Sequence, residues 1–151
     1  MKMRTREKIK VTAIEKFNEF GATNISTIKL SNFMEISPGN YYYYFSSKED
    51  LFNEVLKQEL GIVKATLLKI VDREIEPMEM FKEYMLHRFE LLNNSLNYHE
   101  TLKGNLFDKY KFVKDVLDDF HLFERIQVTL ILEKGMNDGY LEIANINSTV
   151  E

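Results

Sequence analysis

The sequence of 151 residues contains no cysteine, no tryptophan and only two prolines. Without cysteine the chain can form neither a disulfide framework nor a thiolate metal site, which suits a reducing compartment. No apolar run approaches the roughly 18 residues that span a membrane, and residues 1–7 are charged rather than apolar. We therefore expect a soluble cytoplasmic protein that does not interact with membranes.

The sequence also lacks alternating polar and apolar segments, internal repeats and low-complexity tracts. Apolar residues instead recur at helical spacing along most of its length. They make up 44% of the chain, which is enough to fill a core. This pattern predicts an all-α protein.

Charge is divided unevenly along the chain, whose net charge is −4. Residues 1–48 contain eight Lys and Arg against four Asp and Glu, whereas residues 49–151 contain 12 against 20. A basic N-terminal third and an acidic remainder are expected of a protein that binds phosphates at one end. The alternative is a solvated basic start of a helix.

Two helices are predicted in the first part of the chain. The first runs from Thr5 to Gly21, because its apolar residues share one stripe and glycine often ends a helix. Ser26 or Thr27 then caps a short second helix, which is expected to end at Ile36.

A third short helix follows directly, with Ser37 as its cap and Pro38 at its first position, where the missing N–H costs nothing. Two short helices about three residues apart form a helix-turn-helix. Ser47 then caps a long helix to Val71, which Gly61 weakens locally by about 1 kcal/mol relative to alanine.

Helical spacing continues through the remaining part of the chain. Pro77 opens another helix, whose apolar face is predicted to include Phe81, Tyr84, Met85, Phe89 and Leu92. Apolar periodicity recurs over residues 96–107 and 113–132. Gly135 and Gly139 are expected to bracket a turn, and the tail after them has no strong pattern.

Four consecutive tyrosines, Tyr41 to Tyr44, occupy the predicted third helix. At about 100° per residue they point in four directions, so they cannot all be buried on one side. The exposed members suit a nucleic acid, because a tyrosine ring packs while its hydroxyl donates to a phosphate oxygen. The alternative is an unusually aromatic core or an oligomer interface.

The segment from about Thr5 to Leu56 resembles the N-terminal domain of the tetracycline-repressor-like (TetR) family of bacterial transcriptional regulators. The residues that match the family pattern are Ile9, Ala13, Phe17, Gly21, Ser26, Thr27 and the run from Ile36 to Glu49. The resemblance implies a helix-turn-helix DNA-binding domain over residues 1–52 and a helical effector-binding and dimerisation domain over residues 53–151. Family members usually dimerise through two last long helices, so this bundle is expected to be short at its C-terminus.

The resemblance also implies which residues contact DNA: Thr27, Lys29, Ser37, Pro38, Gly39, Asn40, Tyr42, Tyr43 and Lys48. The four residues from Ser37 to Asn40 match the major-groove end of the recognition helix. Tyr42, Lys48 and Thr27 match phosphate-binding positions, and Tyr43 matches one that reaches a phosphate or a base edge. Tyr41 and Phe45, four residues apart, are expected in the core.

One position departs from the family pattern. Ile28 stands where related sequences often carry an arginine that contacts bases. Lys29 is the nearest substitute, and the alternative for Lys29 is a solvated helix lysine.

Family members usually bind a small molecule in the C-terminal domain. The candidates for lining such a pocket here are Tyr84, Met85, Arg88, Phe89, Leu92 and His99. The alternative is that most of them pack in the core, as aromatic and methionine stripes at helical spacing usually do.

No catalytic motif or nucleotide-binding glycine loop is present, and we predict neither an enzyme nor a cofactor. The three histidines are never three or four residues apart, which excludes a His-His metal pair within one helix. A carboxylate-histidine metal site at Glu83 and His87, or at Asp118 and His121, is the remaining alternative of this kind.

The sequence therefore predicts a DNA-binding transcriptional regulator, a repressor released by a small, largely apolar effector. Its operator is expected to be a roughly palindromic double-stranded DNA bound by a homodimer. Apolar residues of the last periodic segment are candidates for the dimer surface, namely Phe120, Phe123, Ile126, Leu130 and Ile131, unless they are buried within the monomer. The alternative is a helical small-molecule carrier or interaction module that keeps the helix-turn-helix only as scaffold.

Overall fold

The computed structural model describes residues 5–103 and 110–150. Within these ranges there are eight helices and no strand, which confirms the all-α prediction. The helices are α1 (Thr5–Phe20), α2 (Thr27–Phe33), α3 (Pro38–Tyr44), α4 (Lys48–Val71), α5 (Pro77–Asn93), α6 (Leu96–Leu102), α8 (Lys111–Asn137) and α9 (Ile146–Val150). None of the described helices is both long and apolar enough to cross a bilayer.

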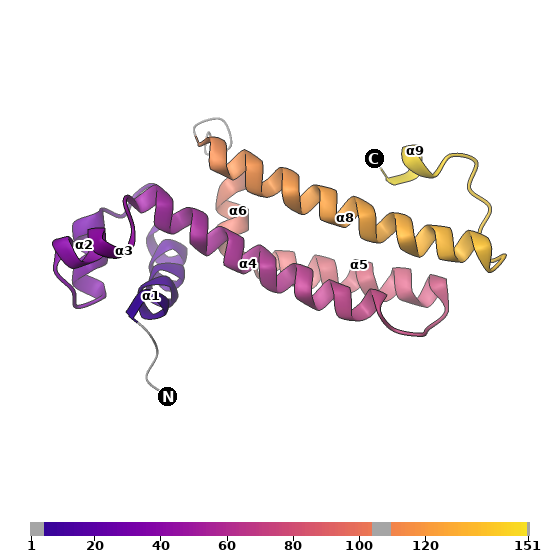
Figure 1. Ribbon diagram of the computed structural model, residues 1–151, viewed down its shortest axis with the longest axis horizontal. Coiled ribbons are helices and arrows are strands. Elements are labelled where there is room, and N and C mark those ends of the chain that lie inside the picture. Colours follow the sequence, from indigo (N-terminus) through magenta and orange to yellow (C-terminus); the bar gives the residue numbers. More distant parts are fainter. Residues whose placement is uncertain (1–4, 104–109, 151) are drawn as a thin grey trace.

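The molecule is elongated, with α1, α2 and α3 gathered at one end (Figure 1). The long helix α4 starts there and runs into a bundle in which it packs against α5 and α8. The short helix α6 contacts both α4 and α1. We call residues 5–52 the head, and residues 53–103 and 110–137 the bundle.

Local signals set the helices of the head as the sequence predicts. Gly21 ends α1 with φ of 81°, a value that favours glycine. Ser26, Ser37 and Ser47 are N-caps, and each hydroxyl accepts the backbone N–H three residues further on at 3.0–3.2 Å. The exact end of α2 was predicted wrongly. It ends at Phe33, before Ile36.

The turn between α2 and α3 explains this earlier end. Glu35 adopts φ of 57°, a left-handed value that is uncommon outside glycine. The Ile36 N–H then bonds the Ser31 carbonyl at 3.1 Å, which closes the turn. No glycine marks this position, so the helix end has no local signal.

The core of the head confirms the two predicted aromatic anchors. Tyr41 and Phe45 are almost completely buried, and Phe17 packs edge-on against Phe52 beside them in the same core. The Tyr41 hydroxyl donates to the Ser47 carbonyl at 3.1 Å, which joins α3 to the start of α4. Burial raises the pKa of the Tyr41 phenol above its ordinary value, so the hydroxyl stays a donor.

The buried face of α5 differs from the prediction. The apolar stripe predicted there included Met85 and Phe89, but both are exposed, and 71% of Phe89 is accessible. Tyr84 and Leu92 of the same stripe are buried as predicted, and Met80, which the stripe did not include, is buried as well. Two neighbouring stripes of α5 are both apolar, and packing against α4 and α8 decides which one is buried.

The prediction for the last helix was also wrong in part. Gly135 lies inside α8, and only Gly139, with φ of 78°, belongs to the turn after it. A Cβ at Gly135 would lie 2.7 Å from the Leu141 side chain, so glycine lets the returning chain pack closely. The tail forms the short helix α9, and the part of the predicted 96–107 segment at 104–109 lies outside the described residues.

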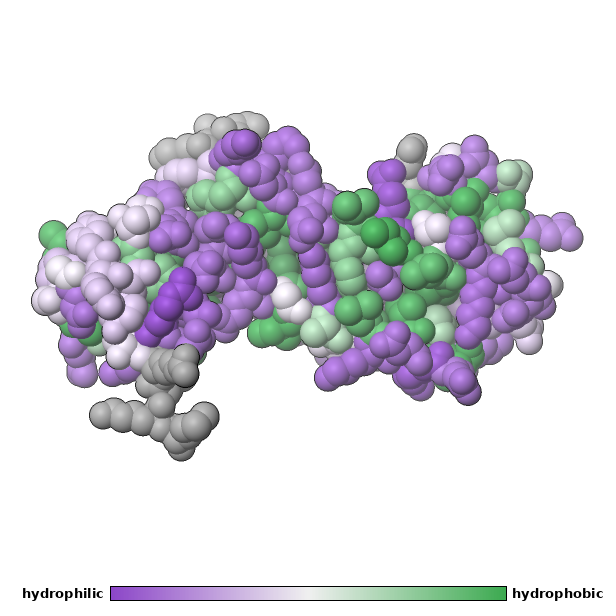
Figure 2. Space-filling view, viewed as in Figure 1, coloured by the Kyte–Doolittle hydropathy of each residue, from purple (hydrophilic) through white to green (hydrophobic). Residues whose placement is uncertain are grey.

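The candidates for a dimer surface separate by burial, and one of them, Phe123, is half-buried against the core. Phe120 and Ile131 are buried within the chain, which corrects their assignment to an exposed surface. Ile126 and Leu130 are about half exposed on α8, together with Leu122 one turn earlier. Figure 2 shows hydrophobic residues gathered on the bundle half of the visible face, whereas the head half is mostly hydrophilic.

Candidate nucleic-acid interface

The N-terminal end of α3 is exposed and carries small side chains. Ser37, Pro38, Gly39 and Asn40 are all exposed, and the Ser37 hydroxyl accepts the Asn40 N–H at 3.1 Å. A Cβ added at Gly39 would have only the Ser37 Oγ near it, at 4.0 Å. The backbone here can therefore approach a flat or grooved partner closely.

The tyrosine run is divided between the core and the surface. Tyr42 is 54% exposed and Tyr43 is 80% exposed, whereas Tyr41 is buried and Tyr44 is half-buried against the core. The Tyr42 ring packs edge-on against Tyr41, and the Tyr43 ring packs edge-on against Tyr44, with centroids 5.4 and 4.9 Å apart. Inner rings thus support outer rings, whose hydroxyls remain accessible.

An open hollow of about 360 Å³ lies beside α3 at the start of α4. It is lined by Ser26, Thr27, Tyr42, Ser46, Ser47, Lys48 and Glu49. Hydroxyl donors, a lysine and the N-terminus of a 24-residue helix suit an anion. The negative charge of Glu49 on one wall disfavours an anion, although its carboxylate accepts a hydrogen bond from the Tyr110 hydroxyl at 3.4 Å.

Lys48 has a structural contact that sequence reasoning missed. Its ammonium donates to the carbonyl oxygens of Thr23 at 3.3 Å and Ile25 at 3.1 Å. These bonds fasten the loop between α1 and α2 to the start of α4. An ammonium has three donors, so one remains for a phosphate.

The two positions of α2 that the sequence singled out are both exposed. Ile28 is 65% exposed and offers no hydrogen bond to a base. The Lys29 ammonium lies 3.9 Å from the centroid of the Phe20 ring, a cation–π contact with α1. Lys29 would have to leave this ring to reach a base edge.

Part of the positive charge of the head is paired with a carboxylate of the same chain. Arg6 pairs with Glu54 at 3.2 Å and lies over the Phe45 ring at 4.7 Å. Two other basic residues of the N-terminal segment, Lys2 and Arg4, lie outside the described residues. The ion pair of Arg6 fixes α1 against α4, and the Arg6 side chain stays partly exposed.

The six candidate effector residues do not gather at one place. Met85 and Arg88 share a hollow of about 600 Å³ between α5 and α8, which α9 also lines. Tyr84 and Leu92 are buried and Phe89 is exposed, and none of the three lines this hollow. His99 is half-buried on α6, elsewhere in the fold.

Arg88 is held by a partly buried ion pair. Its guanidinium makes two hydrogen bonds to the Glu124 carboxylate of α8, one of them at 3.0 Å. The hydrogen bond to Glu124 raises the pKa of Arg88. Within the described part of the chain, the buried Tyr84 hydroxyl has no hydrogen-bond partner, and burial raises the pKa of its phenol.

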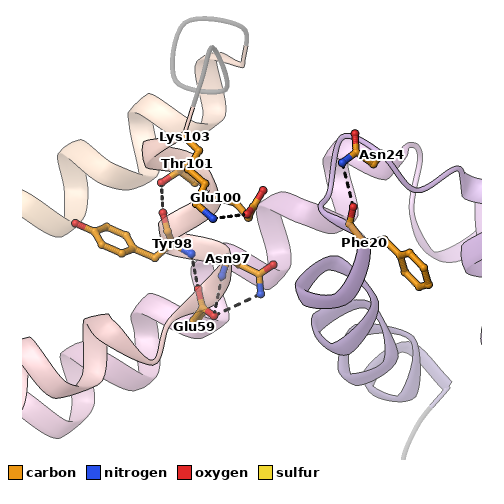
Figure 3. Close-up of polar contacts among 8 residues, drawn as sticks. All are labelled: Phe20, Asn24, Glu59, Asn97, Tyr98, Glu100, Thr101 and Lys103. Carbon is orange, nitrogen blue, oxygen red and sulfur yellow. Dashed lines mark hydrogen bonds and ion pairs between the residues drawn. The ribbon is translucent and has the colours of Figure 1, made fainter.

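The short helix α6 is capped by a residue of another helix (Figure 3). The Glu59 carboxylate of α4 accepts the Tyr98 N–H at 2.8 Å, and the backbone and side-chain N–H groups of Asn97 at 3.4 Å. Ser95 stands at the cap position, but its hydroxyl donates to the Leu91 carbonyl instead. Burial raises the pKa of the Glu59 carboxyl, although these hydrogen bonds oppose the shift.

The other end of α6 meets the end of α1. A Cβ at Gly21 would lie 3.7 Å from a carboxylate oxygen of Glu100, and the Asn24 side chain next to it donates to the Phe20 carbonyl at 3.1 Å (Figure 3). Glu100 pairs with Lys103 at 3.2 Å. A helix fixed to α4 at one end thus touches the head at the other.

Comparison with known proteins identifies relatives of both the sequence and the fold. No protein-family model matches the chain. Over 79 residues the chain is 33% identical to the HTH-type transcriptional regulator RutR of Escherichia coli K12. The match covers 52% of this chain and 37% of the length of that regulator.

Two solved structures cover almost the whole chain. A TetR-family transcriptional regulator from Marinobacter aquaeolei VT8 is 27% identical with a TM-score of 0.78, over 98% of this chain and 72% of that one. The transcriptional regulator FadR from Bacillus subtilis, solved in complex with stearoyl-CoA, is 17% identical with a TM-score of 0.76. That alignment covers 95% of this chain and 78% of the FadR chain, and at this identity it concerns the fold alone.

Proposed function

We propose that this chain, a member of the TetR family, is a transcriptional regulator that binds operator DNA through α3 and releases it when a small molecule binds the bundle. The observation that carries the proposal is the exposed start of α3, with two outward tyrosines and an anion-suited hollow beside it. A helical carrier that keeps the head only as scaffold would have no use for this arrangement.

The contacts divide into phosphate binding and base reading. Tyr42, Thr27 and Lys48 border the hollow and would hold phosphates, which supplies affinity without sequence preference. Asn40 and Tyr43 lie on the exposed side of α3 and would reach base edges in the major groove. Ile28, which is 65% exposed, gives the second helix no polar contact at its position.

A single head reads too few base pairs to find an operator, so we propose a homodimer on a roughly palindromic site. The bundle offers an apolar surface for this pairing on two helices. Its exposed members are Met78, Met85, Leu86 and Phe89 of α5 and Leu122, Ile126 and Leu130 of α8. Residues 1–52 would then be the DNA-binding domain and residues 53–151 the effector-binding and dimerisation domain.

Regulation would follow from a coupling free energy between bundle and head. Helix α4 belongs to both, and α6 is fastened to α4 by Glu59 and touches the end of α1. An effector that shifts these helices would change the distance between the two heads of a dimer. FadR of the same fold was solved with stearoyl-CoA, which supports a largely apolar effector. We further propose that the regulator is a repressor, acts in the cytoplasm and catalyses no reaction.

The test is a gel shift with the DNA that flanks the gene of this protein, repeated over a range of salt concentrations. Lys48→Ala should weaken binding about equally on all sequences and lower the salt slope by about 1 per chain. Tyr42→Phe, which removes only a hydroxyl, should weaken binding while leaving the loop contacts of Lys48 intact. Lys69→Ala, on the exposed far end of α4, is the matched control.

Absence of a salt-dependent shift on any fragment would favour the carrier instead. An unchanged slope in Lys48→Ala, with binding by the wild type intact, would remove Lys48 from the interface.

A further inference from the structure

A cleft of about 420 Å³ opens between α4 and α8, close to the head. Its volume lies within the range of about 300–1,000 Å³ typical of small-molecule sites. Leu60 and Val116 give it a buried apolar floor, and the half-buried Phe112 ring closes one side. None of the effector residues predicted from the sequence lines this cleft.

Gly61 stands in the wall of the cleft, in the middle of α4. Glycine is unfavourable inside a helix, so its presence needs a reason. Its φ is not positive, and a Cβ added there would have nothing within 4 Å. Neither backbone conformation nor close packing requires glycine at this position, and a bulky side chain here would fill the cleft.

The polar groups of the cleft include one unsatisfied acceptor. The amide oxygen of Asn53 is buried and has no hydrogen-bond partner within the described residues. A buried polar atom without a partner is destabilising, and a donor from a ligand that reaches this oxygen would satisfy it. Asp115 on the opposite wall offers a second acceptor.

The cleft also holds one free cation. Lys64 pairs with Asp119 across the cleft and lies 5.4 Å from the Phe123 ring centroid. Among the described residues, Lys57 has no ion pair and is exposed at the cleft. In the hollow between α5 and α8, Arg88 is bound by Glu124, whereas Arg125 is exposed and suits a control variant.

We propose that this cleft is the effector site and that its ligand is a small amphipathic acid. The ligand would have an apolar or aromatic body, one anionic group for Lys57 and an N–H or O–H donor for Asn53. This inference rests on the proposed function, because it names where and what the regulator senses. An occupant here would press directly on α4, the helix that starts at Lys48 in the head.

The test uses anilinonaphthalene sulfonate, a fluorescent probe with an aromatic body, a sulfonate and an N–H donor. We expect saturable binding by the wild type in a fluorescence titration. Gly61→Leu should fill the cleft and weaken binding about tenfold or more, and Lys57→Gln should weaken it about tenfold by removing a charged hydrogen bond. Gly61→Ala, whose methyl group is far too small to fill the cleft, should bind within about twofold of the wild type.

The second control is Arg125→Gln, which removes an exposed charge from the hollow between α5 and α8. The proposal is overturned if Lys57→Gln binds the probe as tightly as the wild type does. It is also overturned if Arg125→Gln weakens probe binding as much as Lys57→Gln does. Circular dichroism shows whether Gly61→Leu folds. If it does not, the comparison of probe binding by Lys57→Gln and by Arg125→Gln tests the proposal without it. Gel shifts without probe are run on every variant, so a failure of DNA binding is recognised separately from a failure of the cleft.

Discussion

In the head, α2 and α3 contain seven residues each, whereas α4 and α8 contain 24 and 27 residues and form the length of the bundle. Helices as short as α2 and α3 are not stable alone. They are held by serine caps and by buried aromatic rings such as Tyr41 and Phe45. The bundle helices are instead held by long apolar stripes, so local signals define the head and packing defines the bundle.

The surfaces of the two regions differ in the same way. The N-terminal third is basic, and its α3 exposes hydroxyls and an amide beside a hollow suited to anions. The acidic remainder exposes apolar side chains on α5 and α8 and an apolar cleft between α4 and α8. The difference indicates two kinds of partner, a polyanion at the head and apolar surfaces or molecules at the bundle.

The largest expected effects come from removing one buried ring in each region. Phe45→Ala in the head and Phe120→Ala in the bundle should each cost about 3–5 kcal/mol of unfolding free energy, because both rings are fully buried. Since α4 is continuous through both regions, we expect one unfolding transition that both substitutions shift. Phe89→Ala, at an exposed ring, is the control, and thermal unfolding followed by circular dichroism is the measurement. Two separate transitions would show that head and bundle unfold independently.

The next largest loss of stability is expected where α6 is fastened to α4 and contacts the head. Glu59→Ala should cost about 1–3 kcal/mol, because it leaves the first N–H groups of α6 without an acceptor. Glu59→Gln keeps an acceptor oxygen and should cost less. Urea unfolding at constant pH measures both. Equal stability of the alanine variant and the wild type would contradict the role of Glu59 as the cap of α6.

The same residue predicts a dependence on pH. Burial raises the pKa of Glu59 in the folded state, so ionisation of this carboxyl costs stability. The wild type should therefore lose stability relative to Glu59→Gln as pH rises from the ordinary glutamate pKa through the raised one, and the difference should stay constant above it. Urea unfolding of both proteins across this window tests the sign, and the opposite slope would contradict it.

A smaller effect is expected at a cap of the head. Ser37→Ala should cost about 1 kcal/mol, and Ser37→Gly only a few tenths, because glycine also leaves the cap N–H groups accessible to water. The two variants are compared by thermal unfolding. A larger cost for glycine than for alanine would mean that the hydroxyl is not acting as a cap.

The smallest effect on stability, with a change in specificity, is expected at Asn40. Its side chain is exposed, so Asn40→Ala should leave the melting temperature unchanged. It should nevertheless change the preference among operators with single-base substitutions, whereas Tyr42→Phe should weaken all of them alike. Identical preference of Asn40→Ala and wild type would remove Asn40 from base reading.

The sequence predicted the head well because its signals are local. Ser37 with Pro38 marks the start of α3, and the spacing of Tyr41 and Phe45 identifies their buried face. It predicted the bundle less well. Both Met80 and Phe89 fit an apolar stripe of α5, and only contact with other helices shows that Met80 is the buried one.

The sequence by itself determined an all-α chain, the helix-turn-helix and the division of the tyrosines between core and surface, because helical spacing and capping act within a few residues. Only the tertiary structure decided that Glu59 caps α6, that Arg88 is bound by Glu124 and that Gly61 opens a cleft against α8. These contacts join residues that lie 36 or more positions apart. No local pattern encodes such pairs, since which helices become neighbours depends on packing of the whole chain.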